Sequence, residues 1–228
     1  MRLSPKYLGR TLNNMKDTKQ VSKAVIKRLP RYRRYVRELK KKKIDRISSN
    51  ELSGIMGYTA SQIRQDLNNF GGFGQQGYGY NIESLDKELS NILGLKMKYT
   101  MVIMGAGNLG QAIANYTSQR ENFSLISMFD INPRLIGIKL NEIPVRDYDE
   151  VTEFVKENNI DIGVICTGKR NAQQVADRLI EGGIKGIWNF APIDLNLPED
   201  MLVENVHLSD SLHSLTYHIS KKFMDDEE

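Results

Sequence analysis

Residues 99–110 read YTMVIMGAGNLG, and this stretch decides the fold of the second half of the chain. Its first six residues are mostly apolar, as in a buried strand, and the pattern G-x-G-x-x-G follows at once and opens an amphipathic helix. In such a unit Gly105 permits a tight turn, Gly107 lets the backbone approach a pyrophosphate, and Gly110 lets helix and strand pack closely. Free backbone N–H groups and the helix dipole then hold the negative phosphates. The stretch therefore predicts a dinucleotide-binding βαβ unit.

An acidic residue stands where such a unit needs one. A second apolar strand, residues 125–129, ends at Asp130, twenty residues after Gly110. A carboxylate there accepts hydrogen bonds from an adenosine ribose and repels a 2′-phosphate, so we expect NAD(H) rather than NADP(H), although Arg134 would soften this choice. Coenzyme A stays open as an alternative, because some Rossmann-like folds bind its phosphates at this place. The predicted nucleotide contacts are Gly105, Ala106, Gly107, Asn108, Leu109, Gly110, Asp130 and Thr167.

Strand and helix patterns alternate beyond this unit. Such alternation predicts an α/β fold of the Rossmann type, with a doubly wound parallel sheet. A short extended piece and a terminal helix follow, and the apolar residues of that helix would pack on another element or another subunit. The expected strands are residues 99–104, 125–129, 160–166 and 186–189, the expected helices are about 109–119, 149–158 and 171–181, the extended piece is 201–206, and the terminal helix is 209–223.

The charge of the chain is divided unevenly. Residues 1–80 hold 18 Lys and Arg against 5 Asp and Glu, a balance of +13, whereas residues 81–228 hold 14 against 23, a balance of −9. A basic module joined to an acidic one indicates that only the front half approaches a polyanion. Nucleic acid is the expected partner of residues 1–80.

The basic half carries the pattern of a winged helix-turn-helix. Ser22 can cap a first helix with one apolar face, which Pro30 should break or kink. Ser48 and Glu51 form a capping-box pattern that opens a short helix ending at Gly57. A third helix is expected from about Thr59 to Phe70. Residues 71–80 then hold five glycines and interleaved aromatics, which favours a tight two-stranded ribbon. Residues 82–93 are expected to form a connecting helix.

The third helix is the expected recognition helix. In a helix-turn-helix the second helix enters the major groove with its N-terminal residues on base edges. Ile63, Leu67 and Phe70 would be buried and leave polar side chains outside, of which Arg64 can reach guanine and Gln62 or Gln65 adenine. The glycine-rich ribbon would serve as a wing. The predicted DNA contacts are Ser61, Arg64, Gln65, Tyr78 and Lys43.

Composition excludes several other classes of protein. The chain has no run of eighteen apolar residues and no secretory signal pattern, so no membrane partner is expected. Its single cysteine, Cys166, excludes an intramolecular disulfide and fits a cytoplasmic protein. We expect Cys166 to be a small core residue, with direct thiol sensing as the alternative. His207, His213 and His218 do not share a helical face, so no metal site is expected.

Taken together, these motifs resemble the Rex family of redox-sensing transcriptional repressors. The resemblance runs from about residue 22 to the terminal helix. It rests on Lys27-Arg28-Leu29-Pro30 with Tyr32, Ser48-Ser49 with Glu51-Leu52, Ile63-Arg64, Asp66-Leu67, Phe70-Gly71, Gly77-Tyr78-Gly79-Tyr80-Asn81, Gly105–Gly110, Phe129-Asp130, Gly183-Ile184-Lys185-Gly186-Ile187 and Asn189-Phe190-Ala191-Pro192.

The resemblance implies a homodimer whose C-terminal helix is exchanged between subunits. It also implies that the protein represses genes on operator DNA while NADH/NAD⁺ is low, and that NADH releases the DNA. A tyrosine and an arginine that link the two domains in the family correspond to Tyr116 and Arg34. Their partner in the family is an aspartate, and this chain has His207.

Two further positions depart from the family pattern. Gln65 and Gln76 stand where the family usually carries basic residues. The loss of two cations should weaken phosphate attraction or shift the preferred operator. Together with His207, these departures leave open a divergent relative with an altered ligand or a weakened redox response.

We predict five segments and one function. The segments are a flexible basic arm (1–21), a winged helix DNA-binding domain (22–80, with the helix-turn-helix at about 31–70), a connecting helix and linker (81–98), a Rossmann domain (99–206) and the C-terminal helix (207–228). The sequence favours a DNA-binding sensor of NAD(H) that is not an enzyme. A dehydrogenase with a basic appendage is the less favoured reading, since little chain remains for a catalytic domain and no His or Lys can be assigned as proton donor.

Overall fold

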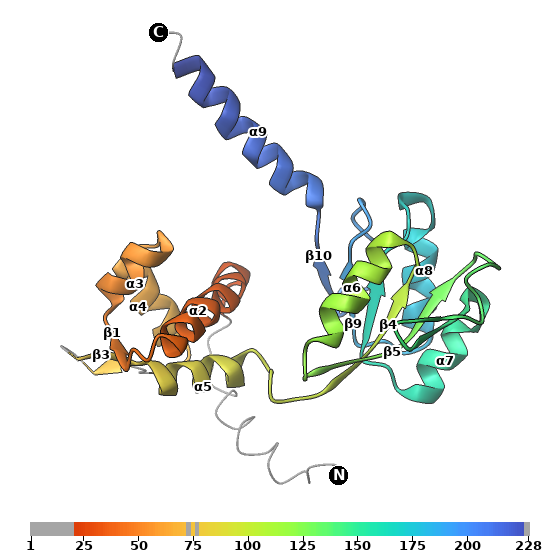
Figure 1. Cartoon of the computed structure of the whole chain (residues 1–228), viewed down its shortest axis with the longest axis horizontal. Helices are drawn as coiled ribbons and strands as arrows, with labels where there is room; N and C mark the ends of the chain where they lie inside the picture. Colours follow the sequence, from red (N-terminus) through yellow and green to blue (C-terminus); the bar gives the residue numbers. More distant parts are fainter. Residues whose placement is uncertain (1–20, 72–73, 76–77, 226–228) are drawn as a thin grey trace. The chain divides into compact units, whose positions relative to one another are not determined.

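The computed structural model describes residues 21–71, 74–75 and 78–225 (Figure 1). The chain divides into two compact units, Met1–Lys96 and Met97–Glu228. The expected arm, apart from residue 21, lies outside the described residues, and so does Gln76.

The first unit packs helices around a small antiparallel sheet. Its elements are α2 (Lys23–Lys41), β1 (Arg46–Ile47), α3 (Ser49–Met56), α4 (Ala60–Asn68), β2 (Gly74–Gln75), β3 (Gly79–Asn81) and α5 (Ile82–Ile92). The strand order is β1-β3-β2, with both pairings antiparallel. β2 and β3 form the ribbon that the glycines predicted, whereas β1, only two residues long, gave no pattern in the sequence. One apolar cluster joins α2, α3, α4 and α5.

The ends of these helices follow from local chemistry. The Ser22 side chain accepts from the N–H of Val25. The Ser48 side chain accepts from the N–H of Glu51, whose carboxylate accepts from the N–H of Ser48, which completes the capping box. Gly57 ends α3 with a left-handed backbone (φ +73°). These local signals confirm the predicted start and stop of α3.

The sequence predicted a break or a kink at Pro30, and the break is wrong. α2 runs unbroken from Lys23 to Lys41 with Pro30 inside it. A proline inside a helix costs about 3 kcal/mol, because it removes one hydrogen bond and crowds the preceding turn. Leu29, Tyr32 and Val36 are almost completely buried on both sides of it. Each buried side chain of this size contributes roughly 1.5–3 kcal/mol, so tertiary packing outweighs the local penalty.

The second unit is built on a seven-stranded sheet. Its strands are β4 (Tyr99–Met104), β5 (Phe123–Asp130), β6 (Lys139–Leu140), β7 (Ile143–Asp147), β8 (Ile162–Ile165), β9 (Gly186–Asn189) and β10 (Leu202–Asn205). The helices are α6 (Asn108–Ser118), the 3₁₀ turn η1 (Tyr148–Glu150), α7 (Val151–Asn158), α8 (Lys169–Glu181) and α9 (Leu208–Asp225). The order is β10-β9-β8-β4-β5-β7-β6, and every pairing is parallel except β6 with β7.

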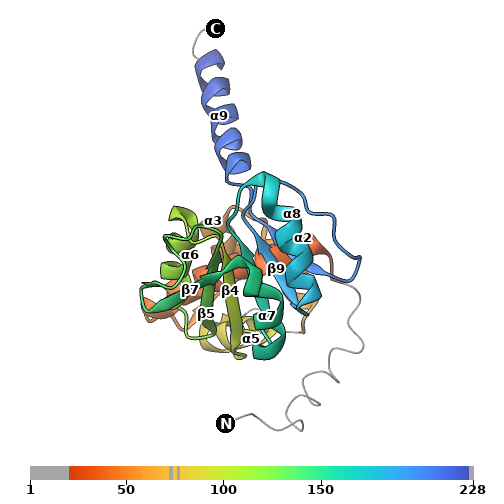
Figure 2. The same ribbon diagram turned by 90° about the vertical axis from the view of Figure 1, so that its right-hand side faces the viewer.

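Helices cover both faces of this sheet, as the alternating pattern predicted. Figure 2 shows α6 on one face and α7 and α8 on the other. Accordingly there are two apolar clusters, one that includes residues of α7 and α8 and one that includes residues of α6. The chain leaves β4 toward β5 on one side and later returns to β8 on the other. Ligands of open α/β sheets bind at such a switch point, outside the carboxyl ends of the strands.

The hairpin of β6 and β7 was missed by the sequence analysis. Its two-residue turn consists of Asn141 and Glu142, both with positive φ (51° and 65°). Such turns usually carry glycine, and a glutamate with positive φ is uncommon. The strands are also short, and one of them contains Pro144. The expected signals for a hairpin are therefore absent from this stretch.

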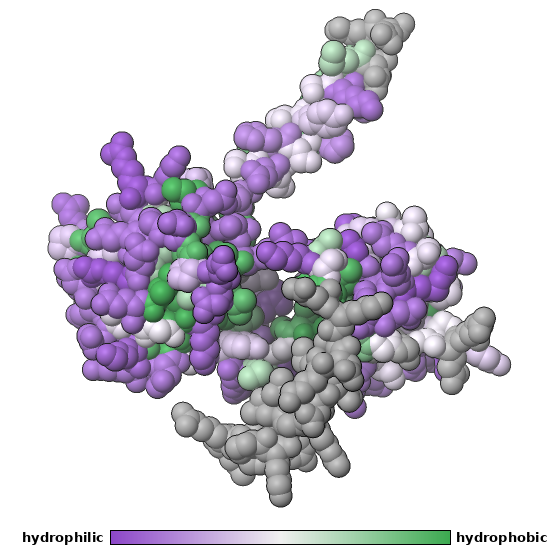
Figure 3. All heavy atoms as spheres, turned by 180° about the vertical axis from the view of Figure 1, so that it is seen from behind, coloured by the Kyte–Doolittle hydropathy of each residue, from purple (hydrophilic) through white to green (hydrophobic). Residues whose placement is uncertain are grey.

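α9 is exposed along its described length. Its side chains from Leu208 to Met224 are all exposed, among them Leu212, Leu215 and Phe223. Figure 3 shows hydrophilic residues mixed with less polar ones along this helix. A helix with this many exposed large apolar side chains lacks a burying partner within the described part of the chain.

Candidate nucleotide site and DNA-reading surface

A pocket of about 400 Å³ opens at the carboxyl ends of three neighbouring strands of the second unit. Residues from the ends of β4, β5 and β8 line it, together with one tyrosine and the first turns of α8. They are Met104, Gly105, Gly107, Phe129, Asp130, Ile131, Cys166, Thr167, Gly168, Tyr148, Asn171, Gln174 and Val175. The pocket therefore lies at the topological switch point.

The three glycines of the turn have different surroundings. Gly105 has φ +100°, and a Cβ there would lie 2.9 Å from the carbonyl oxygen of Cys166. A Cβ on Gly110 would collide with the carbonyl oxygen of Gly105. By contrast, no described atom lies within 4 Å of a Cβ built on Gly107. Gly105 and Gly110 are thus required by the backbone, whereas Gly107 leaves open space beside the pocket.

Two helices present their N-termini at this pocket. Gly107 is the N-cap of α6 and Gly168 is the N-cap of α8, and neither end has a side-chain cap. Both glycines line the pocket. The first N–H groups of a helix lack intrahelical acceptors and carry partial positive charge, which favours phosphate. Asn108 and Leu109, predicted as contacts, form the first turn of α6.

Asp130 lies at the end of β5 with both oxygens engaged. Its Oδ2 accepts from the N–H of Ala106 at 2.7 Å, and its Oδ1 accepts from the N–H of Asn132 at 2.8 Å. A carboxylate has about four acceptor positions, so it can still accept hydroxyl groups of a ribose. The contact with Ala106 adds a role that the sequence did not predict: Asp130 also holds the glycine turn.

Two buried hydroxyl groups at the pocket have no hydrogen-bond partner among the described residues. They are Thr167 Oγ1 and the hydroxyl of Tyr148. A buried polar group without a partner costs about 1–3 kcal/mol, so such groups usually meet a ligand or water. The open Gly107 face, the two helix N-termini and these hydroxyls fit a polar phosphate-bearing ligand.

The sequence analysis missed several residues of this pocket. Tyr148 follows the unpredicted strand β7 in the 3₁₀ turn η1, and the guanidinium of Arg178 lies 4.4 Å from the centre of its ring. Asn171 and Gln174 lie in the first turns of α8. The start of a helix after a central strand of the sheet is a signal that could have identified Asn171.

Cys166 lines the pocket, and burial disfavours the thiolate form of its side chain. Burial raises the pKa of the Cys166 thiol to about 12. Reactive thiols have a lowered pKa and are at least partly exposed to solvent. This environment favours the expected small core residue over direct thiol sensing.

In the first unit, the predicted base-reading residues lie on one exposed side of α4. Thr59 caps the helix by accepting from the N–H of Gln62 at 3.1 Å. Ser61, Arg64 and Gln65 are exposed, while Ile63 and Leu67 are buried. Arg64 Nη1 donates to the hydroxyl of Ser49 at 2.8 Å, at the start of α3. Arg64 is therefore held at the exposed junction of α3 and α4.

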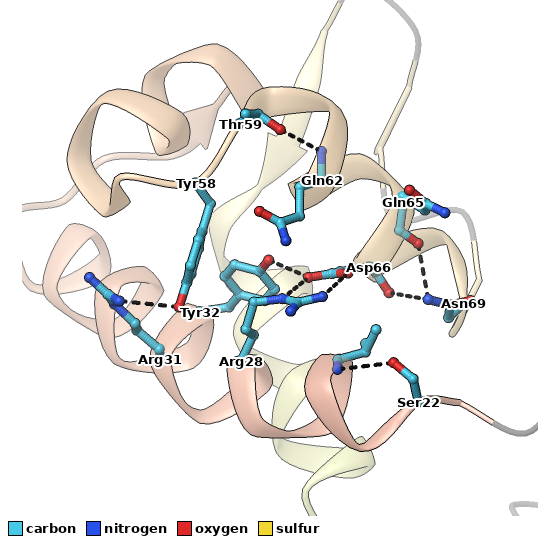
Figure 4. Close-up of polar contacts among 11 residues, drawn as sticks. Ser22, Arg28, Arg31, Tyr32, Tyr58, Thr59, Gln62, Gln65, Asp66 and Asn69 are labelled. Atoms are coloured by element: carbon cyan, nitrogen blue, oxygen red, sulfur yellow. Dashed lines mark hydrogen bonds and ion pairs between the residues drawn. The ribbon is translucent and has the colours of Figure 1, made fainter. Parts of the chain in front are cut away.

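The sequence analysis did not predict that Asp66, on the buried side of α4, would be buried. Asp66 is 3% exposed and is one of four polar residues buried in the described part of the chain. It accepts from Arg28 and Tyr32 of α2 (Figure 4). Arg31 of the same helix instead donates to Tyr58 and to the carbonyl of Met56, before α4.

Tyr78 and Lys43, two of the predicted DNA contacts, lie at or beside the sheet of the first unit. Tyr78 is 70% exposed, and its carbonyl accepts from Arg46 Nη1 of β1 at 3.3 Å. Lys43 lies in the turn before β1, is exposed and has positive φ (58°). This hydrogen bond links the ribbon to β1, which follows Lys43. The two predicted DNA contacts, Tyr78 and Lys43, therefore lie in segments that are connected to each other.

The three residues that the resemblance links to switching each have a local partner. The guanidinium of Arg34, in the first unit, lies 5.4 Å from the centre of the Tyr35 ring. In the second unit Tyr116 is half-exposed and its hydroxyl accepts from Arg120 at 3.2 Å. His207, just before α9, has Nε2 3.5 Å from Asp194 Oδ1, an ion pair only when the imidazole is protonated.

Neither a metal-binding cluster nor a membrane-spanning helix occurs among the described residues. No group of three or more His, Cys, Asp and Glu side chains there could hold a metal ion. No described helix combines the length and the apolar character that a membrane crossing requires.

Two family models match the chain, one on each unit. Residues 20–68 match a model described as the N-terminus of a putative DNA-binding protein. Residues 96–193 match a model described as a CoA binding domain. The first range covers α2, α3 and α4, and the second covers the strands and helices around the pocket.

Similar proteins span nearly the whole chain. A redox-sensing transcriptional repressor Rex of Thermoanaerobacter pseudethanolicus is 59% identical over 209 residues, which cover 91% of this chain and 93% of the relative. The Rex of Clostridium perfringens is 60% identical over 204 residues, which cover 89% of this chain and 96% of the relative. The crystal structure of RSP, a Rex-family repressor, matches with a TM-score of 0.86 and 56% identity, over 92% of this chain and all of the other. RSP in complex with beta-NAD⁺ and operator DNA matches with a TM-score of 0.85 at 58% identity, over 92% of this chain and 97% of the other. At this identity and coverage, the chain belongs to the Rex family of redox-sensing transcriptional repressors.

Proposed function

We propose that this protein is a transcriptional repressor that binds operator DNA through its first unit and releases it when NADH binds in the pocket of the second. The observation that carries the proposal is the pairing of the two sites on one chain. An exposed polar helix face lies in a unit rich in basic residues, and a pocket with two uncapped helix N-termini lies in the other. Rex-family RSP has been solved with beta-NADH and with beta-NAD⁺ and operator DNA.

In the pocket, the N–H groups at the start of α6 would bind the pyrophosphate of the dinucleotide. The open face of Gly107 leaves room for it, and Gly105 and Gly110 maintain the turn. Asp130 would accept the ribose hydroxyls with its remaining acceptor positions, and Thr167 Oγ1 would gain the partner that it lacks. Ala106, Asn108 and Leu109 complete the proposed contacts through their backbone.

On the DNA side, α4 would enter the major groove. Arg64 would leave Ser49 and read guanine, Gln65 would pair with adenine, and Ser61 would contact the edge of the groove or a phosphate. Lys43 would neutralise a phosphate and Tyr78 would place the ribbon against the backbone. Residues 22–80 would thus form the winged helix, with α5 packed in the same unit and the residues that follow it, up to 98, leading to the nucleotide domain.

The exposed apolar residues of α9 favour a homodimer. We propose that α9 packs on a second copy of the chain, in the exchanged arrangement that the family resemblance implies. Arg34, Tyr116 and His207 would then couple nucleotide state to DNA affinity. A regulator of bacterial genes acts in the cytoplasm and needs no catalytic step, so we assign no enzymatic activity.

The test is a titration of the complex with DNA. A duplex selected by the chain from a random-sequence library is bound at fixed salt, and NADH and NAD⁺ are added separately. The proposal expects NADH to release the duplex at lower concentration than NAD⁺. Equal release by both nucleotides, or none by either, would refute redox sensing.

Coenzyme A is the second candidate ligand, favoured by the family model that matches residues 96–193. Its phosphates would suit the same helix N-termini. Competition separates the two: coenzyme A should displace bound NADH only weakly if the pocket is specific for the nicotinamide dinucleotide. Displacement by coenzyme A at lower concentration than by NAD⁺ would favour the second candidate.

A further inference from the structure

Three polar side chains join α2 to the recognition helix α4. Arg28 donates to Asp66 twice, from Nε to Oδ2 at 2.6 Å and from Nη2 to Oδ1 at 2.8 Å. The hydroxyl of Tyr32 donates to Asp66 Oδ2 at 2.5 Å. Figure 4 shows Arg28 and Tyr32 pointing from α2 toward Asp66. One carboxylate of α4 is thus held by three donors from one neighbouring helix.

This network is withdrawn from water. The side chain of Asp66 is 4% exposed and that of Arg28 is 19% exposed. The hydrogen bonds from Arg28 to Asp66 raise the pKa of the guanidinium further above its ordinary value. Burial, followed by the bond to Asp66, raises the pKa of the Tyr32 hydroxyl above its ordinary value. Both donors therefore keep their protons throughout the physiological pH range.

A contact of this kind contributes orientation more than stability. A buried ion pair is often no more stabilising than apolar side chains of the same volume, because desolvation offsets the attraction. A bidentate pair between arginine and carboxylate, however, has one favourable geometry. The apolar contacts of Ile63 and Leu67 are non-directional and tolerate small rotations of a helix only nine residues long.

Asp66 lies directly beside the base-reading residues in sequence. It follows Arg64 by two positions and Gln65 by one, so any rotation of α4 that moves Asp66 moves both of them. The geometry points to Arg28, Tyr32 and Asp66 as positioning residues that fix the rotation of α4, and thereby the register of Arg64 and Gln65 on base edges. This inference rests on the proposed function, in which α4 reads the operator.

The test replaces the whole network without changing net charge. Arg28→Met, Tyr32→Phe and Asp66→Leu are combined in the full chain, so that one positive and one negative charge are lost together. The control is Glu38→Leu with Lys41→Met, which removes an exposed ion pair of α2 with the same charge balance. Affinity is measured for the duplex selected by the wild-type chain and for a scrambled duplex of equal composition. Hydrogen exchange of the α4 amides is measured without DNA.

We expect the ratio of the two affinities to fall about tenfold or more in the triple variant, mainly through the selected duplex. Affinity for the scrambled duplex and the melting temperature should stay close to those of the wild type, since phosphate attraction and burial are kept. The α4 amides should exchange faster while those of α3 do not. The control variant should match the wild type in every measurement.

Two results would overturn the inference. One is an unchanged affinity ratio in a folded triple variant, whatever its hydrogen exchange. The other, should the triple variant fail to fold, is an unchanged ratio in Tyr32→Phe alone, for which we expect a loss of about twofold or more. If the wild type itself does not discriminate between the duplexes, the proposed function fails. The exchange of α4 then decides whether the network orients the helix.

Discussion

The N–H of Ala106 donates to Oδ2 of Asp130 at 2.7 Å, which joins the glycine turn after β4 to the end of β5. The same carboxylate accepts from Asn132 through its other oxygen. In a Rossmann dinucleotide-binding unit, the role usually assigned to the acid after the second strand is hydrogen bonding to the ribose. Here it also fixes the turn that would hold the pyrophosphate, so one side chain can influence both halves of the nucleotide site.

Replacement of this acid should weaken nucleotide binding through both roles. Asp130→Ala should lower NADH affinity roughly 10–100-fold, which corresponds to the loss of hydrogen bonds to a charged group. The difference between NADH and NADPH should narrow, because the repulsion of a 2′-phosphate is lost. Calorimetry with both nucleotides measures this, with Glu153→Ala, an exposed acid of α7, as the control for charge. A wild-type chain that binds NADPH as tightly as NADH would contradict the assigned role.

Two glycines of the turn should respond in opposite ways to the same methyl group. Gly110→Ala should lower the free energy of unfolding by about 2 kcal/mol or more, because its Cβ collides with the Gly105 carbonyl. Gly107→Ala should change stability by less than about 1 kcal/mol, since its Cβ would meet open space and its φ of −72° suits alanine. NADH affinity should nevertheless fall about tenfold, because the methyl group occupies the path of the phosphates. Denaturant unfolding and calorimetry test the pair, and equal stability of the two variants would refute the packing role of Gly110.

Arg64 and Lys43 should affect DNA binding differently. Arg64→Ala should cost roughly 1–3 kcal/mol on the selected duplex, mainly as lost discrimination between bases. Lys43→Ala should weaken binding to all duplexes alike and reduce the slope of affinity against salt by about one. Binding of selected and scrambled duplexes over a salt series distinguishes them. An unchanged specificity ratio in Arg64→Ala would remove this residue from the base-reading set.

His207 should limit the coupling between nucleotide and DNA. A carboxylate at this position could accept from Arg34 at neutral pH, as the family resemblance implies, whereas a protonated imidazole would repel it. We therefore expect His207→Asp to increase the loss of operator affinity caused by NADH, since a ligand shifts states only through differential contacts. Identical release of DNA by NADH from both proteins would place His207 outside the switch.

The thiol of Cys166 should resist alkylation. With the pKa raised to about 12 by burial, the protonated form persists far above neutral pH. An exposed cysteine with a pKa of about 8.5 reacts readily at pH 8, because the thiolate is the nucleophile. Iodoacetamide labelling followed by mass spectrometry should therefore show slow modification of the folded chain and fast modification in denaturant. The pKa of this thiol is higher in the folded chain than in the unfolded chain. The contribution of the protonated thiol to the free energy of unfolding is therefore complete below about pH 8.5 and is lost as the pH rises toward 12.

Local signals in the sequence predicted much of the fold. The strand at residues 99–104, the glycine turn and the capping box at Ser48 each involve neighbours within a few residues, and all three are present. The hairpin turn at Asn141 and Glu142 was missed because its backbone conformation is one that these residue types seldom adopt.

Long-range contacts account for the other differences. The helix through Pro30 persists because of packing that the local sequence does not display. Asp66 reads as a polar surface residue until its partner Arg28, 38 residues earlier, is in place. Tyr148 reaches the nucleotide pocket through a strand that the pattern did not reveal. These contacts depend on elements distant in sequence, which periodicity and capping rules cannot relate.

Because the two halves of the chain carry opposite net charge, ionic strength should affect nucleotide binding and DNA binding differently. The acidic half, with its balance of −9, must receive an anionic nucleotide, which the helix N-termini at the pocket favour locally. Added salt screens the long-range repulsion between this half and the incoming anion, so nucleotide association should become faster. The same salt weakens the attachment of the basic half to DNA by reducing the gain from counterion release. A rise in salt concentration would therefore act on both halves in one direction, toward the nucleotide-bound protein free of its operator.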